Sequence, residues 1–296
     1  MRAVLGLCLL ALSLPLAAAQ RVVSLAPSMT EIILELGAER RLVGLLDDDR
    51  RPAELAAVPS VGGFDKLELE TLLSLRPDLI LLAPGSLPDP QLRQLRDLGM
   101  PLYLGDPRDL AALAEQFAEI GALVGRAERG RELRARFRDG MAELRVRYHR
   151  ERPLAVFYQV WHQPLYTIGS GQILGEALEV CGAHNLFADV NLPAPQVSVE
   201  SVLARAPEVI LGGSGAELGH WHAWPQLPAV RLGQLWTVPD KGIERPSFQM
   251  LGATEKLCET LAAARAVGWV EPQAIPIRWA MGIGAMRLRP SCAAPS

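Results

Sequence analysis

The sequence predicts an α/β protein made of two similar α/β lobes bridged by a long helical connector, with a ligand cleft between the lobes. Three observations predict this architecture. Short apolar segments alternate with amphipathic helical segments, a pattern typical of parallel sheets. One sequence pattern occurs twice, at residues 70–81 and 200–211. Between the two copies, residues 108–151 show helical periodicity without a strand signal.

The predicted first lobe covers residues 20–107 and contains short buried strands and helices in alternation. Ser28 and Glu31 have the spacing of a capping box, which predicts that the first helix begins at Ser28. Gly37 is expected to end this helix in the left-handed conformation. The other elements are strands at 21–26, 42–46, 79–82 and 101–104 and helices at 69–75 and 91–98.

The connector and the second lobe follow. Apolar stripes at residues 110–124 and 133–148 predict helix through the connector, residues 108–151. The second lobe, residues 152–267, begins with a predicted strand at 154–158. Residues 268–296 contain four prolines and no sustained periodicity, so we expect an irregular tail.

The repeat is the most informative feature of the chain. Each copy begins with an acidic residue, Glu70 or Glu200, and continues as a helix of about two turns that a proline ends before a buried strand. A shorter echo, at residues 34–38 and 178–183, precedes each copy. Two such lobes on a stiff bridge enclose a cleft, and ligands bind preferentially in clefts between domains.

The first residues predict export. Arg2 precedes an almost wholly apolar segment, Val4–Leu16, and the small residues Ala17 to Ala19 follow it. This is the pattern of a secretory signal peptide, residues 1–19, with cleavage expected after Ala19. An uncleaved membrane anchor is the alternative. The formal net charge of -3 disfavours a nucleic-acid binder, because such proteins are usually basic.

Cysteine usage fits an exported protein with a large core. Removal of the signal peptide leaves Cys181, Cys258 and Cys292, and two of these can pair in an oxidising compartment. The chain has no C-x-x-C motif, which argues against a thiolate metal site.

Catalytic motifs are also missing from the sequence. It has no G-x-S-x-G, H-E-x-x-H or P-loop motif, so we expect neither an enzyme nor a resident cofactor. His220 and His222 lie two residues apart without a matching carboxylate or cysteine cluster, which is a weak signal for a metal site. A metal-dependent periplasmic enzyme that uses these two histidines remains an alternative.

Several segments carry a family likeness. RVVSLAPSMTE, VGGFDKLELE, RPDLILL, LPAPQVSVESVLARAPEVIL and IERPSF resemble the periplasmic cobalamin-binding proteins of ABC importers, in the helical-backbone class of substrate-binding proteins. The likeness covers residues 21–264. It implies a periplasmic protein that captures cobalamin or a related corrinoid and delivers it to a permease dimer in the inner membrane. Relatives of this architecture bind haem or siderophores, which are the alternative ligands.

The resemblance also implies roles for individual residues. Phe64 and Tyr166 match aromatics that face the corrin ring, and Glu244 and Arg245 match a polar pair at the ligand. Glu70 and Glu200 match the glutamates that dock onto arginines of the permease. Cys181 and Cys258 match the family disulfide, which leaves Cys292 free. We expect the protein to act as a monomer.

The chain departs from the family pattern at three positions. Ala83 and Ala194 stand where tryptophans are expected, and Asp48 stands near a tyrosine position. Three aromatic surfaces for the ligand are therefore missing. Neighbouring loops offer replacements, and we predict that these are Trp161, Trp221 and Trp224.

Overall fold

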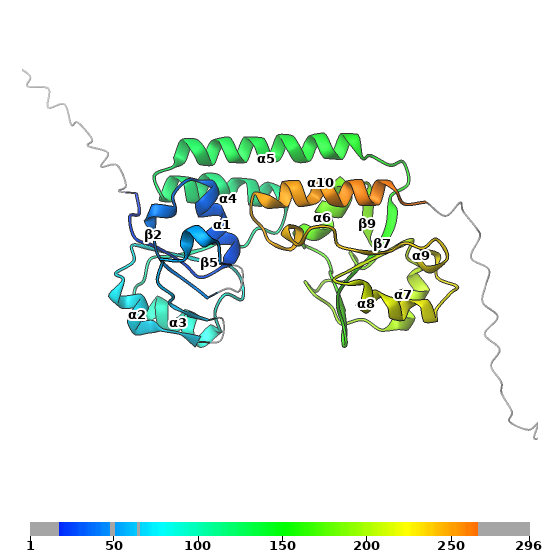
Figure 1. Ribbon diagram of the computed structural model, residues 1–296, viewed down its shortest axis with the longest axis horizontal. Helices are drawn as coiled ribbons and strands as arrows, with labels where there is room; N and C mark the ends of the chain where they lie inside the picture. Colours follow the sequence, from blue (N-terminus) through cyan, green and yellow to red (C-terminus); the bar gives the residue numbers. More distant parts are fainter. Residues whose placement is uncertain (1–17, 48–50, 64–65, 266–296) are drawn as a thin grey trace, which may run out of the picture. The chain divides into compact units, whose positions relative to one another are not determined.

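The computed structural model describes residues 18–47, 51–63 and 66–265, and Figure 1 shows their secondary structure. Asp48, Phe64, the apolar part of the predicted signal peptide and the tail with Cys292 lie outside the described residues. None of the described helices is both long enough and apolar enough to cross a membrane.

The first lobe is built on a parallel sheet with strand order β2-β1-β5-β6. Its strands are β1 (Val22–Ser24), β2 (Leu42–Leu45), β5 (Leu79–Leu82) and β6 (Leu102–Leu104), and its helices are α1 (Pro27–Glu35), α2 (Leu69–Ser74) and α3 (Asp89–Asp97). Two short strands, β3 (Gly62–Gly63) and β4 (Lys66–Leu67), form an antiparallel pair between β2 and α2 in the sequence. The predicted strands and helices are all present, each within two residues of the predicted bounds at either end.

The predicted capping box of α1 is wrong. The helix begins at Pro27, its N-cap is Ala26, and no side chain caps it. Proline suits the first helical position because its fixed φ matches the helix and its missing N–H would have had no partner there. Ser28 therefore lies inside the helix, and Glu31 is free to bond elsewhere. Gly37 follows the helix with a φ of 64°, as predicted.

The second lobe has the same sheet, extended by one hairpin. Parallel strands run in the order β11-β10-β7, β9 pairs with the other side of β7, and β8 pairs antiparallel with the end of β7. The strands are β7 (Leu154–His162), β8 (Leu165–Thr167), β9 (Ala183–Asn185), β10 (Val209–Gly212) and β11 (Leu235–Thr237). The helices are α6 (Ile173–Val180), α7 (Val199–Arg205), α8 (Gly215–Leu218), α9 (Pro228–Arg231) and α10 (Gln249–Ala262). β7 is longer than predicted because its last residues pair with β8.

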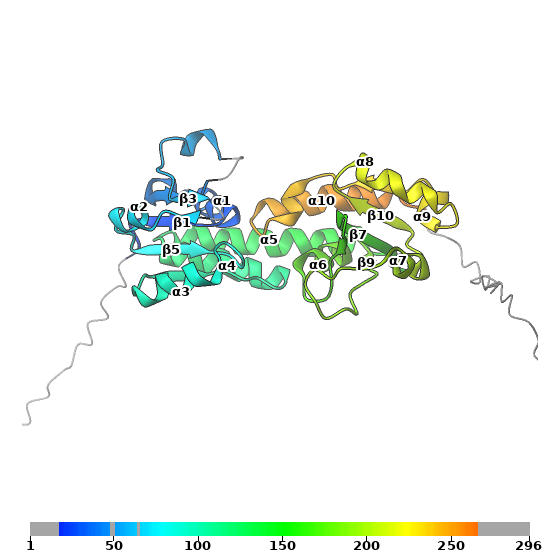
Figure 2. The same cartoon turned by 90° about the horizontal axis from the view of Figure 1, so that it is seen from below.

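The helical connector is a pair of helices, α4 (Leu110–Leu123) and α5 (Ala127–Arg147), joined by a short turn. They pack closely because glycines face each other: a Cβ on Gly121 would lie 2.9 Å from the Cα of Gly130. The rings of Phe117 and Phe137 meet edge to face across the pair, at 5.4 Å between centroids. In Figures 1 and 2, α5 runs alongside α4 and α10, and residues of both lobes and the connector share one apolar core.

The repeat is reproduced in three dimensions. Its two copies form α2 with β5 and α7 with β10, and the strand order β2-β1-β5-β6 corresponds to β9-β7-β10-β11. Arg76 and Ala206, at matching positions, both have positive φ, 46° and 49°. Each precedes a proline, and the proline ring excludes the right-handed helical region for the residue before it. Gly37 and Gly182 match in the same way, with φ of 64° and 67°.

A disulfide joins Cys181, at the end of α6, to Cys258 in α10. Both cysteines are buried. The pairing implied by the family resemblance is confirmed.

Candidate functional site

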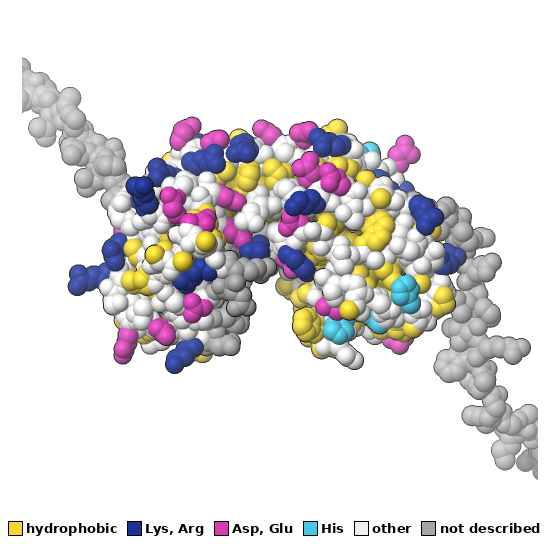
Figure 3. All heavy atoms as spheres, in the orientation of Figure 1, with side chains coloured by type: hydrophobic (Ala, Val, Ile, Leu, Met, Phe, Trp, Pro, Cys, Tyr) yellow, Lys and Arg dark blue, Asp and Glu magenta, His cyan; other side chains and the backbone are white. Residues whose placement is uncertain are grey.

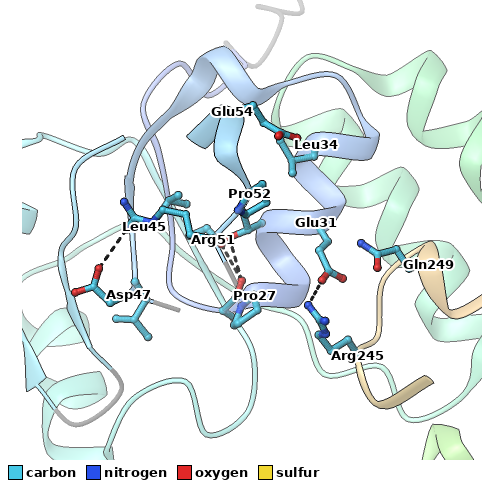
Figure 4. A pocket seen from close by; sticks show the side chains of 14 residues that line it. Pro27, Glu31, Leu34, Leu45, Asp47, Arg51, Pro52, Glu54, Arg245 and Gln249 are labelled. Atoms are coloured by element: carbon cyan, nitrogen blue, oxygen red, sulfur yellow. Dashed lines mark hydrogen bonds and ion pairs between the residues drawn. The ribbon is translucent and has the colours of Figure 1, made fainter. Parts of the chain in front are cut away.

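A cavity of about 430 Å³ lies where the first lobe meets residues of the second (Figure 4). Its walls come from the carboxyl ends of β1 and β2, from the first turns of α1 and from the segment around Pro52. Arg245 and Gln249 of the second lobe close one side. Ligands of open parallel sheets bind outside the carboxyl ends of the strands, so this cavity has the expected place for a ligand site.

An ion pair crosses this cavity between the lobes. Arg245 donates from Nη1 to Oε1 of Glu31, a residue of α1 that is 8% exposed. Glu31 Oε2 and Arg245 Nε are buried and have no hydrogen-bond partner among the described residues. Buried polar atoms normally have partners, so the pair retains one acceptor and one donor for a polar ligand group.

The opposite wall holds a second charged pair. Arg51 donates to Asp47 over 3.3 Å and to the backbone carbonyl of Val58 over 2.9 Å. Figure 4 shows this pair across the cavity from Glu31 and Arg245. Donors and acceptors of both charges thus line the cavity, an arrangement that suits neutral polar groups such as amides.

Glu35 places a titratable carboxyl near the junction of the lobes. Its Oε2 accepts a hydrogen bond of 3.1 Å from the backbone N–H of Phe248, beside the start of α10. Burial raises the pKa of Glu35 to about 7, with a contribution from the Glu31 carboxylate, against the lowering effect of the Phe248 hydrogen bond. The charge of this contact therefore changes near neutral pH.

Glu244 and Arg245, which the family resemblance implies to be a polar pair at the ligand, have different surroundings. Arg245 lines the cavity, whereas Glu244 does not. Glu244 Oε1 accepts hydrogen bonds from the buried Tyr158 hydroxyl, 2.9 Å away, and from Lys241, 3.1 Å away. Burial and the Glu244 carboxylate together raise the pKa of Tyr158 well above its usual value. Glu244 thus anchors the segment that carries Arg245.

Trp161 and Tyr166 lie on a hairpin, not on a loop as predicted. They are cross-strand neighbours on β7 and β8. Trp161 is 55% exposed, its Nε1 donates to the Gln163 carbonyl over 2.9 Å, and Val160 beside it is also exposed. The hairpin thus presents an aromatic surface to solvent, although neither aromatic lines the cavity that contains Arg245.

The prediction that Trp221 faces a ligand is wrong. Its side chain is 0% exposed, it packs edge to face on Phe157, and its Nε1 donates to Gln159 Oε1 over 2.8 Å. Trp224 is half-buried and packs against the same apolar cluster. An indole has a large apolar surface, and the Trp221 indole is buried in the core of the second lobe.

The two histidines of the same segment are exposed. His220 Nδ1 faces the backbone carbonyl of Glu217, and His222 lies one residue beyond Trp221. Among the described residues, no group of three His, Cys, Asp or Glu side chains is arranged to hold a metal ion. His220 and His162 do line a second cavity, of about 570 Å³, on the second lobe.

Glu70 and Glu200 occupy equivalent positions in the first turns of α2 and α7. Both side chains are exposed. Hydrogen bonds from its own backbone N–H and from the Ser198 hydroxyl lower the pKa of Glu200. The predicted placement of both residues in first helical turns is confirmed, and their role is treated below as a proposal.

Sequence reasoning missed most of the cavity wall. The sequence predicts a capping role for Glu31, and Asp47 and Arg51 belong to no recognisable motif. Glu31 and Arg245 lie 214 residues apart, so only the packing of the lobes reveals their contact.

Comparison with known proteins places this geometry in a family. Residues 22–241 match the family model described as periplasmic binding protein. The chain is 33% identical to the vitamin B12-binding protein of Vibrio cholerae over 250 residues, which cover 83% of this chain and 91% of that protein. It is also 33% identical to the vitamin B12-binding protein of Yersinia pseudotuberculosis over 267 residues, which cover 88% and 93%.

Solved structures agree. The periplasmic vitamin B12 binding protein BtuF of Vibrio cholerae superposes with a TM-score of 0.74 at 32% identity, over 82% of this chain and 97% of that one. The periplasmic heme binding protein HutB of Vibrio cholerae has a TM-score of 0.71 at 24% identity, over 82% and 98%, which shows a shared fold alone. The match over residues 22–241, the two-lobed α/β fold and the relatives at 33% identity lead to one assignment: this chain belongs to the periplasmic binding protein family.

Proposed function

We propose that this protein captures cobalamin or a related corrinoid between its two lobes and delivers it to the permease of an ABC importer. The observation that carries the proposal is the similarity to vitamin B12-binding proteins, at 33% identity over nearly their whole length. The haem-binding structure is less similar in sequence, at 24% identity.

The site offers the two kinds of contact that a corrinoid needs. Its flat ring system favours aromatic faces, for which the exposed Trp161 and its neighbour Tyr166 are available on the second lobe. Its peripheral amides need donors and acceptors, which Arg245, Glu31 and Arg51 supply. Figure 3 shows that the surface is hollowed between the two lobes. A corrinoid is larger than a cavity of 430 Å³, so the ring would lie in this hollow while amide groups enter the cavity.

The family resemblance implies ligand roles for two further residues, Phe64 and Glu244. Phe64 matches an aromatic that faces the corrin ring. Glu244 would act through Arg245, since it anchors the segment that carries Arg245 by binding Tyr158 and Lys241. No resident cofactor and no catalytic residue takes part in this scheme.

We place the mature protein in the periplasm. The signal pattern of residues 1–19 predicts export with cleavage after Ala19. The disulfide between Cys181 and Cys258 suits an oxidising compartment.

Delivery would use Glu70 and Glu200. These exposed carboxylates begin equivalent helices, one in each lobe, so a monomer presents one to each half of a two-fold permease dimer. Arginines of the permease would bind them, which sets docking orientation and rate.

A haem receptor is the second candidate. It is favoured by the exposed His220 and by His162, which line one cavity and could ligate an iron.

Visible absorption separates the two candidates. The mature chain is incubated with equal amounts of cyanocobalamin and haem, passed through a desalting column and examined. The proposal expects the corrinoid spectrum in the protein fraction. A haem spectrum alone would transfer the assignment to the second candidate.

A further inference from the structure

The first strands of the two lobes, β1 and β7, begin in the same hydrogen-bonded arrangement. In the first lobe, Asp78 Oδ1 accepts from the Arg21 N–H over 2.8 Å, and the Asp78 N–H donates back to the Arg21 carbonyl over 3.0 Å. In the second lobe, Glu208 Oε2 accepts from the Ala155 N–H over 3.1 Å, and the Glu208 N–H donates back to the Ala155 carbonyl over 2.9 Å. Asp78 and Glu208 are matching residues of the repeat.

The two arrangements differ in one charge. Glu208 also pairs with Arg152, which precedes β7, over 2.5 Å. Asp78 has no side-chain cation partner in the described part of the chain. Its Oδ2 instead accepts from the backbone N–H of Gln20, over 2.8 Å. Gln20 is the residue that follows the predicted cleavage site.

Resting on the export step of the proposed function, we propose that Asp78 is the binding site for the N-terminal ammonium group of the mature protein. Hydrolysis of the Ala19–Gln20 peptide bond adds water, leaves a carboxylate on Ala19 and turns the Gln20 nitrogen into an amine, which takes up a proton. That ammonium group lies where Gln20 already donates to Asp78. It supplies in the first lobe the cation that Arg152 supplies in the second.

The ion pair offsets contacts that cleavage removes. Before cleavage, the Ala19 N–H donates to the Leu123 carbonyl over 2.8 Å, and Arg41 donates to the Ala19 carbonyl. These contacts tie Ala19 to the connector and to the first lobe. After cleavage, the ammonium–Asp78 contact holds the new terminus beside β1.

The site also protects a reactive terminus. A free N-terminal glutamine cyclises when its uncharged amine attacks the side-chain amide carbon: a ring C–N bond forms, the bond to Nε2 breaks, and ammonia leaves. A protonated amine cannot attack. By binding the ammonium form, Asp78 slows this modification of Gln20.

The test compares two chain starts in two backgrounds. One chain begins at Gln20, and the other keeps Ala18 and Ala19, so that its ammonium group lies two residues away from Asp78. Each is made with and without Asp78→Asn. Asp78 is exposed, so we expect the substitution to lower Tm by about 1–3 °C more in the Gln20 chain than in the longer chain, at pH 6 and low salt. The matched control, Glu208→Gln, should lower Tm equally in both chains.

The extra effect depends on the charge of the amine. It should vanish at pH 10, where an N-terminal amine with an ordinary pKa of about 8 is neutral, and shrink in high salt. The unsubstituted chains give the same answer if the variant does not fold: the Tm of the Gln20 chain should fall relative to that of the longer chain between pH 6 and pH 10.

Mass spectrometry supplies the second readout. Asp78→Asn should accelerate the loss of ammonia from the Gln20 chain several-fold, and Glu208→Gln should not. Equal Tm effects in both chain starts, or equal cyclisation rates, would overturn the proposal. An exported protein that begins at another residue would also overturn it, and would leave the corrinoid assignment untouched.

Discussion

Arg245 shows why single residues of this site are hard to assign from sequence. The family resemblance implies a ligand role for Arg245, but it does not identify the partner of this side chain. In the folded chain it is paired with Glu31 from the other lobe, and removal of Arg245 leaves the buried Glu31 carboxylate uncompensated. Its neighbour Glu244, adjacent in sequence, bonds to Tyr158 instead. Adjacent charges therefore serve different purposes, which only the packing reveals.

The surroundings of the aromatic residues Trp221 and Trp161 are equally hard to predict from sequence. Trp161 lies in β7, and Trp221 lies in a short 3-10 helix, Gly219–Ala223. Nothing in their local sequence predicts which of the two side chains is buried. In the structure, Trp221 is fully buried and Trp161 is more than half exposed. The sequence offered several aromatic candidates, but it could not tell an exposed ring from a buried one.

Trp161→Ala tests the exposed ring. We expect corrinoid affinity to fall about five- to tenfold, because a stacked aromatic contributes about 1 kcal/mol beyond its buried area. Tm should change little, since the ring is exposed. The control is Val146→Ala, an exposed apolar residue on α5. Calorimetric titration with equal affinities in both variants would contradict a ligand role for Trp161.

Glu35 gives a prediction in pH. Its pKa is raised in the folded chain, to about 7 from 4.5, so the fold favours the protonated form. Its contribution to stability is complete below pH 4.5 and is lost as pH rises through about 7. The loss is at most about 3.5 kcal/mol, from 1.4 kcal/mol per pKa unit.

The measurement is urea unfolding at several pH values between 4.5 and 8. Glu35→Gln should flatten the profile and stabilise the protein at pH 8. The control is Glu179→Gln, at the matching position of the repeat, where the side chain is exposed and no such change is expected. Identical pH profiles for wild type and Glu35→Gln would refute the prediction.

At the scale of elements, periodicity and the repeat predicted most of the fold. The helix–proline–strand units were placed correctly because their signals are local: an apolar stripe, a proline and a buried strand lie within a dozen residues. The errors arose at the ends of elements, where backbone pairing and the residue at the first helical position decide the boundary. β7 extends to His162 because β8 pairs with it, and α1 begins at Pro27 without a side-chain cap.

The disulfide links two elements, α6 and α10. Replacement of both cysteines with serine should reduce the free energy of unfolding by about 4 kcal/mol, since the bond closes a loop with a sequence separation of 77 residues. Chemical denaturation measures this loss. Cys292→Ser is the control and should have no effect. Peptide mapping that found Cys292 bonded to either of the other two cysteines would contradict the assignment.

At the scale of the whole molecule, the two lobes offer one acidic helix start each. The double reversal Glu70→Lys with Glu200→Lys should leave Tm and corrinoid affinity nearly unchanged, because exposed charges contribute little to folding. It should abolish uptake and stimulated ATP hydrolysis by the cognate importer, with partial effects for each single change.

The control reverses two other exposed acids, again one in each lobe: Asp97→Lys with Glu179→Lys changes the net charge equally. Uptake should persist in this control. A Glu70 and Glu200 double variant that lost corrinoid binding but still docked would move these residues from the docking surface into the ligand site.

The central claim is that a corrinoid binds between the lobes, against Arg245. Calorimetric titration of cyanocobalamin into the mature protein tests it most directly, with Arg245→Gln titrated alongside. The account predicts saturable one-to-one binding to the wild type and affinity at least about tenfold lower in the variant, as expected for loss of a charged hydrogen-bond donor. No binding of cyanocobalamin, or equal affinity in the two proteins, would contradict it.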